Sequence, residues 1–402
     1  MFTRRRLLGG AGVTGLALWS GRAGAEATVN LTLPGGHATR PITTDFPQKG
    51  AMILQRTRPP LLETPLEVFD EGVLTPNARF FVRWHWSVIP TQVNVDTFRL
   101  RVHGQVEQPL SLSLADLTAL PPFEIVAVNQ CSGNSRGYFE PRVAGGEWGN
   151  GAMGNARWTG VRLKDVLDKA GVKAGAVAVR FDGLDEPTVA GAPDFVKSLG
   201  IDHARDGEVM IAYAMNGEQL PLLNGFPLRL VVPGWYATYW IKMLSDIEVL
   251  DQPDDNYWMK TAYLIPDTPG ADIKPGQVGV RTVPINRMNP RSFVTNLKAG
   301  ATLHTSEITP VRGIAFGGDT GVKRVDFSAD GGMTWEPASL GKDEGKYSFR
   351  RFEVRFTPAM PGSQTLMVRC TNMSDVAQPE RPNWNPAGFM RNVIESTPVS
   401  VV

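Results

Sequence analysis

The pattern of apolar residues changes near Pro275, and this change divides the chain into two parts. After Pro275 the helical signals fade, and short alternating segments separated by turn residues take over. One of the turns is at residues 330–332 (DGG), and the alternating segments are residues 325–327, 352–356 and 366–370. Such regular spacing predicts an all-β, immunoglobulin-like sandwich of about 115 residues, which we place within residues 276–402.

The signals before Pro275 are mixed. A chain of 402 residues is too long for one ordinary core, so two domains are expected. Apolar residues recur at helical spacing over residues 162–170, and Gly171 follows as a C-cap, which predicts a helix. Strands are predicted at residues 98–102, 125–128, 226–232 and 240–250. We therefore expect an α+β domain over residues 71–275.

The N-terminus has the pattern of an export signal. Residues 3–8 begin a basic segment with paired arginines, residues 9–19 are apolar and glycine-rich, and residues 23–25 are small enough for signal cleavage. The paired arginines match a twin-arginine signal, so residues 1–25 are predicted to send the folded chain to the periplasm; an ordinary secretory signal is the alternative. Residues 26–70, rich in Pro and Thr, predict an extended arm.

Charge and cysteine content argue against several classes of function. The formal net charge is +1 and the Lys and Arg residues form no basic stripe, which argues against nucleic acid as a partner. No later segment approaches about 18 uninterrupted apolar residues, so no membrane span is expected. The two cysteines, Cys131 and Cys370, are too few for a disulfide scaffold, and Cys370 is expected in the core of the sandwich. No Cys-x-x-Cys-His run occurs, so we expect no haem on this chain.

Cys131 lies in the run 129–136 (NQCSGNSR), five residues before Arg136. A thiolate is a soft ligand for a transition metal, and an arginine beside it would attract an anion to that metal. The alternative is a small buried hydrophobe, since the apolar residues 125–128 lead into this cysteine. The glycine, asparagines and arginine around it would make a poor core, so we favour a metal ligand.

The sequence Gln-Cys-x-Gly-Asn-x-Arg at residues 130–136 resembles the molybdenum-ligand loop of the sulfite oxidase family. Residues 137–143 (GYFEPRV) and 151–158 (GAMGNARW) are similar to the bacterial periplasmic sulfite dehydrogenases of that family. The similarity runs from about Thr75 to the C-terminus, with the motifs in the family's order. It implies a molybdopterin-binding domain followed by an immunoglobulin-like domain through which members often dimerise.

The resemblance also implies a cofactor and its ligands. Molybdenum in this family is held by the dithiolene of a pyranopterin and by one protein cysteine, which matches Cys131. Arg229 and Lys242 match positions that hold the pterin phosphate, which positive side chains bind well, and Asp185 matches an acidic pterin contact. The full set of predicted cofactor-binding residues is Phe81, Val82, Arg83, Trp84, His85, Asp185, Asn224, Arg229, Trp240, Ile241 and Lys242.

The implied function is that of a periplasmic sulfite dehydrogenase, which oxidises sulfite to sulfate. The predicted catalytic residues are Arg83 and Arg136, which would bind the anion, and Tyr263, which matches a tyrosine whose hydroxyl points into the substrate pocket. Electrons are expected to pass singly to an external c-type cytochrome, from a homodimer or from a heterodimer with a cytochrome subunit.

Two alternatives stay open. A sulfane dehydrogenase acting on carrier-bound sulfur belongs to the same superfamily, although we expect its cysteine loop to lack the arginine found at Arg136. A non-catalytic periplasmic adhesion or binding module would also contain a β-sandwich.

Several positions depart from the vertebrate members of the family. Asn224 stands where they have a histidine, and Trp84 where they have an asparagine. Residues 144–146 (AGG) match the stretch that carries a lysine, and Ala387 occupies the position of a further substrate arginine, whose loss we do not expect Arg391 to compensate. These differences predict a less positive substrate pocket.

Overall fold

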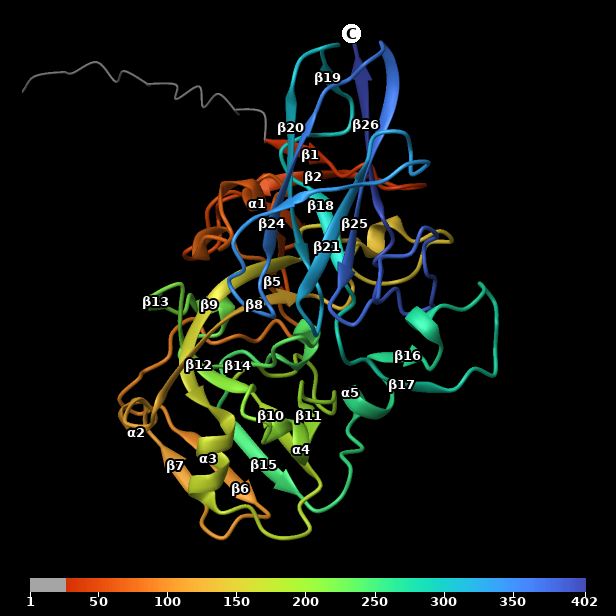
Figure 1. Cartoon of the computed structure of the whole chain (residues 1–402). Coiled ribbons are helices and arrows are strands. Elements are labelled where there is room, and N and C mark those ends of the chain that lie inside the picture. Colours follow the sequence, from red (N-terminus) through yellow and green to blue (C-terminus); the bar gives the residue numbers. More distant parts are fainter. Residues whose placement is uncertain (1–26) are drawn as a thin grey trace, which may run out of the picture.

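The computed structural model describes residues 27–402, and the predicted export signal lies outside the described residues. Figure 1 shows a mixed region of helices and strands at the bottom and a tall all-β region at the top, where the C-terminus ends. Among residues 27–402, none of the helices combines the length and the apolar character that a membrane span needs.

An antiparallel sheet opens the described chain and ends at the predicted cofactor segment. Its strands are, in spatial order, β1 (Thr28–Asn30), β2 (Thr39–Thr43), β3 (Met52–Arg56), β4 (Leu61–Glu63) and β5 (Val82–Arg83). β4 pairs with β5, so that Leu61 lies opposite Arg83 and Leu62 opposite Val82. Residues 27–70, the described part of the predicted extended arm, thus contain regular structure that this expectation did not include.

Two sheets build the mixed region, in the orders β11-β10-β15-β6-β7 and β13-β12-β9-β8, with β14 also paired to β12. Their strands are β6 (Leu100–Gly104), β7 (Leu110–Leu112), β8 (Pro122–Gln130), β9 (Met153–Arg162), β10 (Ala178–Asp182), β11 (Lys197–Gly200), β12 (Met210–Met215), β13 (Glu218–Gln219), β14 (Arg229–Val231) and β15 (Asp246–Leu250). The α-helices are α1 (Val68–Glu71), α2 (Leu114–Thr118), α3 (Leu163–Ala170), α4 (Ile201–Ala204) and α5 (Tyr257–Lys260).

The helix predicted at residues 162–170 is confirmed as α3. Gly171 ends it with a φ of 70°, a left-handed conformation that a residue without a Cβ adopts at little cost. The strand predicted at residues 240–250 is right only for its second half, β15. Met243 interrupts the first half with a φ of 52°, so its apolar residues enter the core from a turn rather than from a strand.

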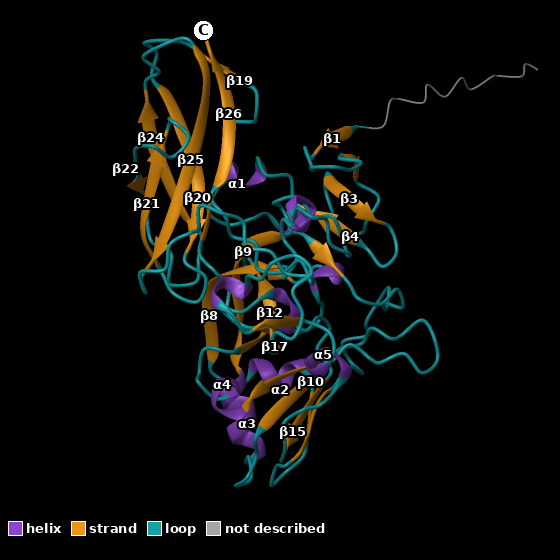
Figure 2. Cartoon of the chain, turned by 90° about the vertical axis from the view of Figure 1, so that its right-hand side faces the viewer, coloured by secondary structure: helices purple, strands orange, loops and turns teal. Residues whose placement is uncertain are grey.

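Two facing sheets form the C-terminal region, in the orders β18-β20-β24-β23 and β19-β26-β25-β21-β22 (Figure 2). Their strands are β18 (Arg291–Val294), β19 (Ala301–Leu303), β20 (Thr309–Phe316), β21 (Val322–Ser328), β22 (Glu336–Pro337), β23 (Ser339–Leu340), β24 (Arg350–Phe356), β25 (Gly362–Asn372) and β26 (Glu395–Val401), and a short hairpin of β16 (Leu264–Pro266) and β17 (Thr282–Pro284) precedes them. One apolar cluster from both sheets fills the space between them. The three alternating segments predicted from the sequence are confirmed as parts of β21, β24 and β25.

Hydrogen bonds tie the C-terminal region to the strand that leads to Cys131. In β8 the backbone nitrogen of Val128 donates to the carbonyl oxygen of Tyr347 at 2.9 Å. In β9 the Asn155 side-chain amide donates to the Ser348 hydroxyl at 2.9 Å. The two regions are therefore joined by polar contacts close to the predicted metal ligand.

Candidate active site

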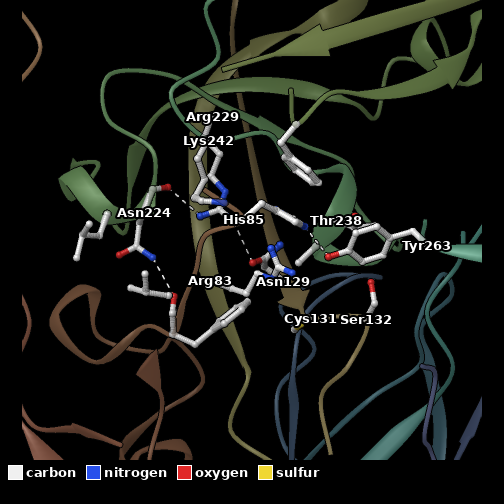
Figure 3. A pocket seen from close by; sticks show the side chains of 15 residues that line it. Arg83, His85, Asn129, Cys131, Ser132, Asn224, Arg229, Thr238, Lys242 and Tyr263 are labelled. Carbon is white, nitrogen blue, oxygen red and sulfur yellow. Dashed lines mark hydrogen bonds between the residues drawn. The ribbon is translucent and has the colours of Figure 1, made fainter. Parts of the chain in front are cut away.

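Cys131 follows β8 directly, and its side chain faces a cavity inside the mixed region (Figure 3). The backbone nitrogen of Cys131 donates to the carbonyl oxygen of Ala152 at 2.9 Å, and the residue is 8% exposed. This inner cavity holds about 440 Å³ of space free of protein atoms, part of it open to solvent. The predicted site residues that line it are Phe81, Val82, Arg83, His85, Cys131, Asn224, Arg229, Lys242 and Tyr263.

The inner cavity gathers buried polar atoms that have no hydrogen-bond partner among the described residues. They are Arg83 Nη1, His85 Nδ1, Asn129 Nδ2, Ser132 Oγ, Arg229 Nε and Thr238 Oγ1. Native proteins leave few buried polar groups unpaired, and nearly all of these atoms can donate a hydrogen bond. A ligand rich in acceptors, such as the pterin with its phosphate, would satisfy them.

Two cationic side chains, Arg229 and Lys242, also line the inner cavity. Arg229 donates to the carbonyl oxygen of Asn224 at 2.8 Å and to Asn129 Oδ1 at 3.0 Å, and both acceptors are neutral. Burial lowers the pKa of Arg229 to about 9, and burial together with the Arg229 charge lowers the pKa of Lys242 to about 7. Burial raises the pKa of Asp185 to about 6, despite the nearby Lys242. A bound phosphate would stabilise both cations, so the residues present fit the predicted cofactor.

His85 and Tyr263 form a hydrogen-bonded pair on the cavity wall. His85 Nε2 lies 2.5 Å from Tyr263 Oη, and the imidazole stacks on Phe195 with ring centroids 3.3 Å apart. Burial, followed by the charge of Arg83, lowers the pKa of His85 well below its usual value, so the imidazole is neutral at pH 7. The tautomer with its proton on Nε2 leaves the hydroxyl proton of Tyr263 free to donate to a bound anion.

An outer cavity adjoins the inner one. It shares Arg83, His85 and Tyr263 with the inner cavity, and adds Arg136. The three predicted catalytic side chains, Arg83, Arg136 and Tyr263, therefore all line the outer cavity, and two of them, Arg83 and Tyr263, also line the inner cavity with Cys131.

Arg136 lies in a narrow slot of the outer cavity. A Cβ atom added at Gly133 or Gly145 would lie 2.5 or 2.7 Å from its guanidinium, so a larger residue at either position would displace the arginine from this place. Arg136 Nη2 donates to the carbonyl oxygen of Ala387 at 3.2 Å, and its guanidinium lies 5.0 Å from the centre of the Phe389 ring. No described carboxylate forms an ion pair with Arg136, so its charge is available to an anion.

The four remaining predicted cofactor-binding residues do not line the inner cavity, and one of them, Asp185, is buried without lining either cavity. Trp84 lines the outer cavity, whereas the side chains of Trp240 and Ile241 are buried in the core and line neither cavity. Arg391 donates to Glu395 at 2.7 Å, so it does not supply the positive charge that Ala387 lacks.

Sequence reasoning missed several residues of the site. Lys49 donates to Asn224 in the wall of the inner cavity, across 175 residues of sequence. Phe195, Thr238 and Phe389 line one cavity or the other. Each is a single residue outside any recognisable motif, and only the three-dimensional contacts reveal it.

Comparisons with known proteins agree with this arrangement. Residues 86–258 match the family model of the oxidoreductase molybdopterin binding domain, and residues 282–400 match that of the Mo-co oxidoreductase dimerisation domain. The mitochondrial sulfite oxidase of Mus musculus is 34% identical over 390 residues, which cover 92% of this chain and 69% of the relative. The sulfite oxidase of Gallus gallus is 35% identical over 370 residues, which cover 88% and 79%.

A solved structure shares the fold. The sulfane dehydrogenase SoxCD from Paracoccus pantotrophus superposes with a TM-score of 0.70 and 24% identity, and the match covers 84% of this chain and 83% of that one. The predicted succession of a molybdopterin-binding domain and a β-rich C-terminal domain is therefore confirmed.

Proposed function

Since the chain belongs to the sulfite oxidase family of molybdenum-dependent oxidoreductases, we propose that it is a periplasmic sulfite dehydrogenase that passes electrons singly to a c-type cytochrome. The observation that carries this proposal is the position of Arg136. Its guanidinium, which pairs with no described carboxylate, faces the outer cavity with Arg83 and Tyr263, and these two residues also line the inner cavity with Cys131. Two arginines that pair with no carboxylate of residues 27–402 are a suitable binding site for a small dianion such as sulfite.

The protein's own residues would hold the cofactor and orient the substrate. Molybdenum, bound through Cys131 and the pterin, supplies the two-electron redox chemistry that converts sulfite and water to sulfate. Arg229 and Lys242 would bind the pterin phosphate from the wall of the inner cavity. Arg83 and Arg136 would fix the oxygens of sulfite, which directs the sulfur lone pair towards the Cys131 side of the space.

Tyr263 adds a neutral donor to this anion site. With His85 donating from Nε2, the Tyr263 hydroxyl can donate to a sulfite or sulfate oxygen without adding another charge. The Arg136 guanidinium lies over the Phe389 ring, 5.0 Å from its centre, and this cation–π contact would help to hold the guanidinium in place for the anion.

Turnover of free sulfite tests the proposal directly. The purified full-length protein, produced in cells that make the cofactor, should contain about one molybdenum per chain and should reduce ferricyanide rapidly with sulfite. Slow reaction with sulfite and rapid reaction with carrier-bound sulfur would favour the sulfane dehydrogenase alternative. Protein without molybdenum would contradict the cofactor assignment and leave a binding module as the better reading.

We propose that the C-terminal region mediates association, either of two copies or with a cytochrome subunit. The match of residues 282–400 to a dimerisation domain supports this role. Light scattering should give twice the mass of one chain for the homodimer. Exchange of the paired arginines Arg4 and Arg5 for lysine should retain the protein in the cytoplasm if the export signal is of the twin-arginine type.

A further inference from the structure

Lys49 is a buried cation that the proposed reaction does not use. It lies between β2 and β3 of the N-terminal sheet, is 8% exposed, and forms no ion pair with a described carboxylate. Its ammonium donates to the carbonyl oxygens of Asn77 at 2.8 Å and Phe80 at 3.0 Å, and to Asn224 Oδ1. Lysine is rarely buried without a carboxylate partner, because desolvation of the charge is costly.

The contacts of Lys49 lead stepwise into the inner cavity. Asn224, whose Oδ1 accepts a hydrogen bond from the Lys49 ammonium, donates from Nδ2 to the carbonyl oxygen of Phe81 at 3.1 Å. Its own carbonyl oxygen accepts from Arg229, which in turn donates to Asn129, two residues before Cys131. A single buried network thus connects the N-terminal sheet with the loop of the predicted metal ligand.

Lys49 also contributes positive charge. Lys49 and Arg229 both donate to Asn224, and burial, followed by repulsion from the Arg229 charge, lowers the pKa of Lys49 to about 7, so the ammonium is fully charged at pH 7 only with an anion nearby. A methionine would fill the same volume without this cost, so packing alone does not account for a lysine here. An anion bound beside Arg229 would compensate both charges.

We propose that Lys49 is a positioning residue of the cofactor site, which orients the Asn224 amide and adds positive charge beside Arg229 so that the anionic end of the pterin is retained. This inference rests on the proposed cofactor site and extends it to a segment outside the region that matches the molybdopterin-binding domain. The N-terminal sheet is then part of the cofactor-binding structure, since both β5 and Lys49 connect it to the inner cavity.

Lys49→Met tests the charge at nearly constant volume. Molybdenum and pterin per chain are measured in the purified full-length protein and again after prolonged dialysis. We expect the variant to lose the cofactor about tenfold faster than the parent, the lower end of the effect of residues that support metal ligands indirectly. Gln48→Ala is the matched control, because Gln48 holds the same loop to the nitrogen of Leu222 from an exposed position, and it should retain the cofactor like the parent.

A second measurement separates charge from stability. Full-length protein produced without cofactor is melted with and without inorganic phosphate, which should raise the melting temperature of the parent and of Gln48→Ala. If Lys49 only supports the fold, Lys49→Met lowers the melting temperature but keeps the phosphate-dependent rise; if Lys49 acts as proposed, the rise is lost.

Lys49→Gln covers the case in which Lys49→Met does not fold. The neutral amide can still donate to the carbonyl oxygens of Asn77 and Phe80, which supports the fold but removes the charge, so cofactor loss about tenfold faster than in the parent is expected. Unchanged cofactor content and an unchanged phosphate response in both variants would overturn the inference. A parent protein without molybdenum would instead contradict the proposed function, so the two failures are distinguishable.

Discussion

The two cysteines occupy opposite kinds of buried environment. Cys370 lies in β25, is fully buried in the apolar cluster of the C-terminal region, and its thiol contacts the carbonyl oxygen of Phe316 at 3.6 Å. Burial raises the pKa of the Cys370 thiol far above its usual value, which keeps it protonated. Cys131 instead faces a cavity with unpaired polar atoms and with Arg229 and Lys242 in its wall.

The difference teaches that the neighbours of a buried thiol, rather than its burial, decide what it can do. Apolar neighbours keep the Cys370 thiol neutral and packed, whereas the cavity beside Cys131 leaves room for a ligand. The same substitution at the two positions should therefore damage different properties of the protein.

Cys131→Ser is expected to have the largest effect. Sulfite turnover should fall by more than about 100-fold, because the effect of losing a direct metal ligand exceeds that of losing its indirect supports. The melting temperature should stay close to that of the parent, since the cavity wall is otherwise intact. Steady-state kinetics and a thermal melt measure both properties, and a variant with full turnover would remove Cys131 from the proposed mechanism.

Arg136→Gln should weaken substrate binding at the same site. The KM for sulfite should rise about 10- to 100-fold, because a charge-assisted hydrogen bond contributes about 1.5–3 kcal/mol. Arg391→Gln is the control, as Arg391 pairs with Glu395 instead of facing the cavity. Equal KM values for the two variants would mean that Arg136 does not bind sulfite.

Cys370→Ser tests whether Cys370 has only a packing role. A hydroxyl in this apolar cluster should lower the free energy of unfolding by about 1–3 kcal/mol, measured by urea denaturation. Turnover per folded molecule should not change. Loss of turnover without loss of stability would mean that Cys370, like Cys131, acts in catalysis rather than in packing.

The smallest effect is expected at Asp70, which connects α1 to the C-terminal region. Its carboxylate accepts from Arg312 Nη2 at 2.7 Å, and the bond to Arg312 lowers the pKa of Asp70 below its ordinary value of 3.8. The ionised form therefore stabilises the fold fully above pH 4, and this contribution is lost as the pH falls through the lowered pKa.

Asp70→Asn should cost about 1 kcal/mol or less at pH 7, because both side chains of this pair are partly exposed. The difference in melting temperature between parent and variant should shrink between pH 4 and pH 2.5. Asp343→Asn removes an ion pair with Arg350 inside the C-terminal region and serves as the control. If the difference in melting temperature instead grew at low pH, the ionised form of Asp70 would not be the form that stabilises the fold.

Local sequence patterns predicted the parts of the fold that depend on local periodicity. The alternating segments became β21, β24 and β25, and helix α3 formed where spacing and a C-cap glycine indicated it. The loop at residues 130–136 carried enough characteristic residues to locate the predicted metal ligand. Arg136, predicted from the same motif, lines the outer cavity.

Contacts between distant segments could not be predicted in this way. The pairing of β4 with β5 joins two segments of which the first lacks a strand pattern, and Lys49 reaches Asn224 only after folding. At Met243 the prediction from the sequence was wrong. Its apolar neighbours in sequence favoured a strand, but its backbone is left-handed, with a φ of 52°. Tertiary contacts decided each of these structures.

The hydrogen bond from Val128 to Tyr347 limits how this protein can be rebuilt. A chimera that joins its mixed region to the sandwich of a relative would have to preserve the backbone course at residues 347–348. Otherwise the backbone N–H of Val128 and the side-chain amide of Asn155 would lose their hydrogen-bond acceptors, and Val128 is only three residues before Cys131. The sequence alone suggests two separable domains. A working chimera nevertheless has to keep the hydrogen bonds of Val128 and Asn155 to residues 347–348.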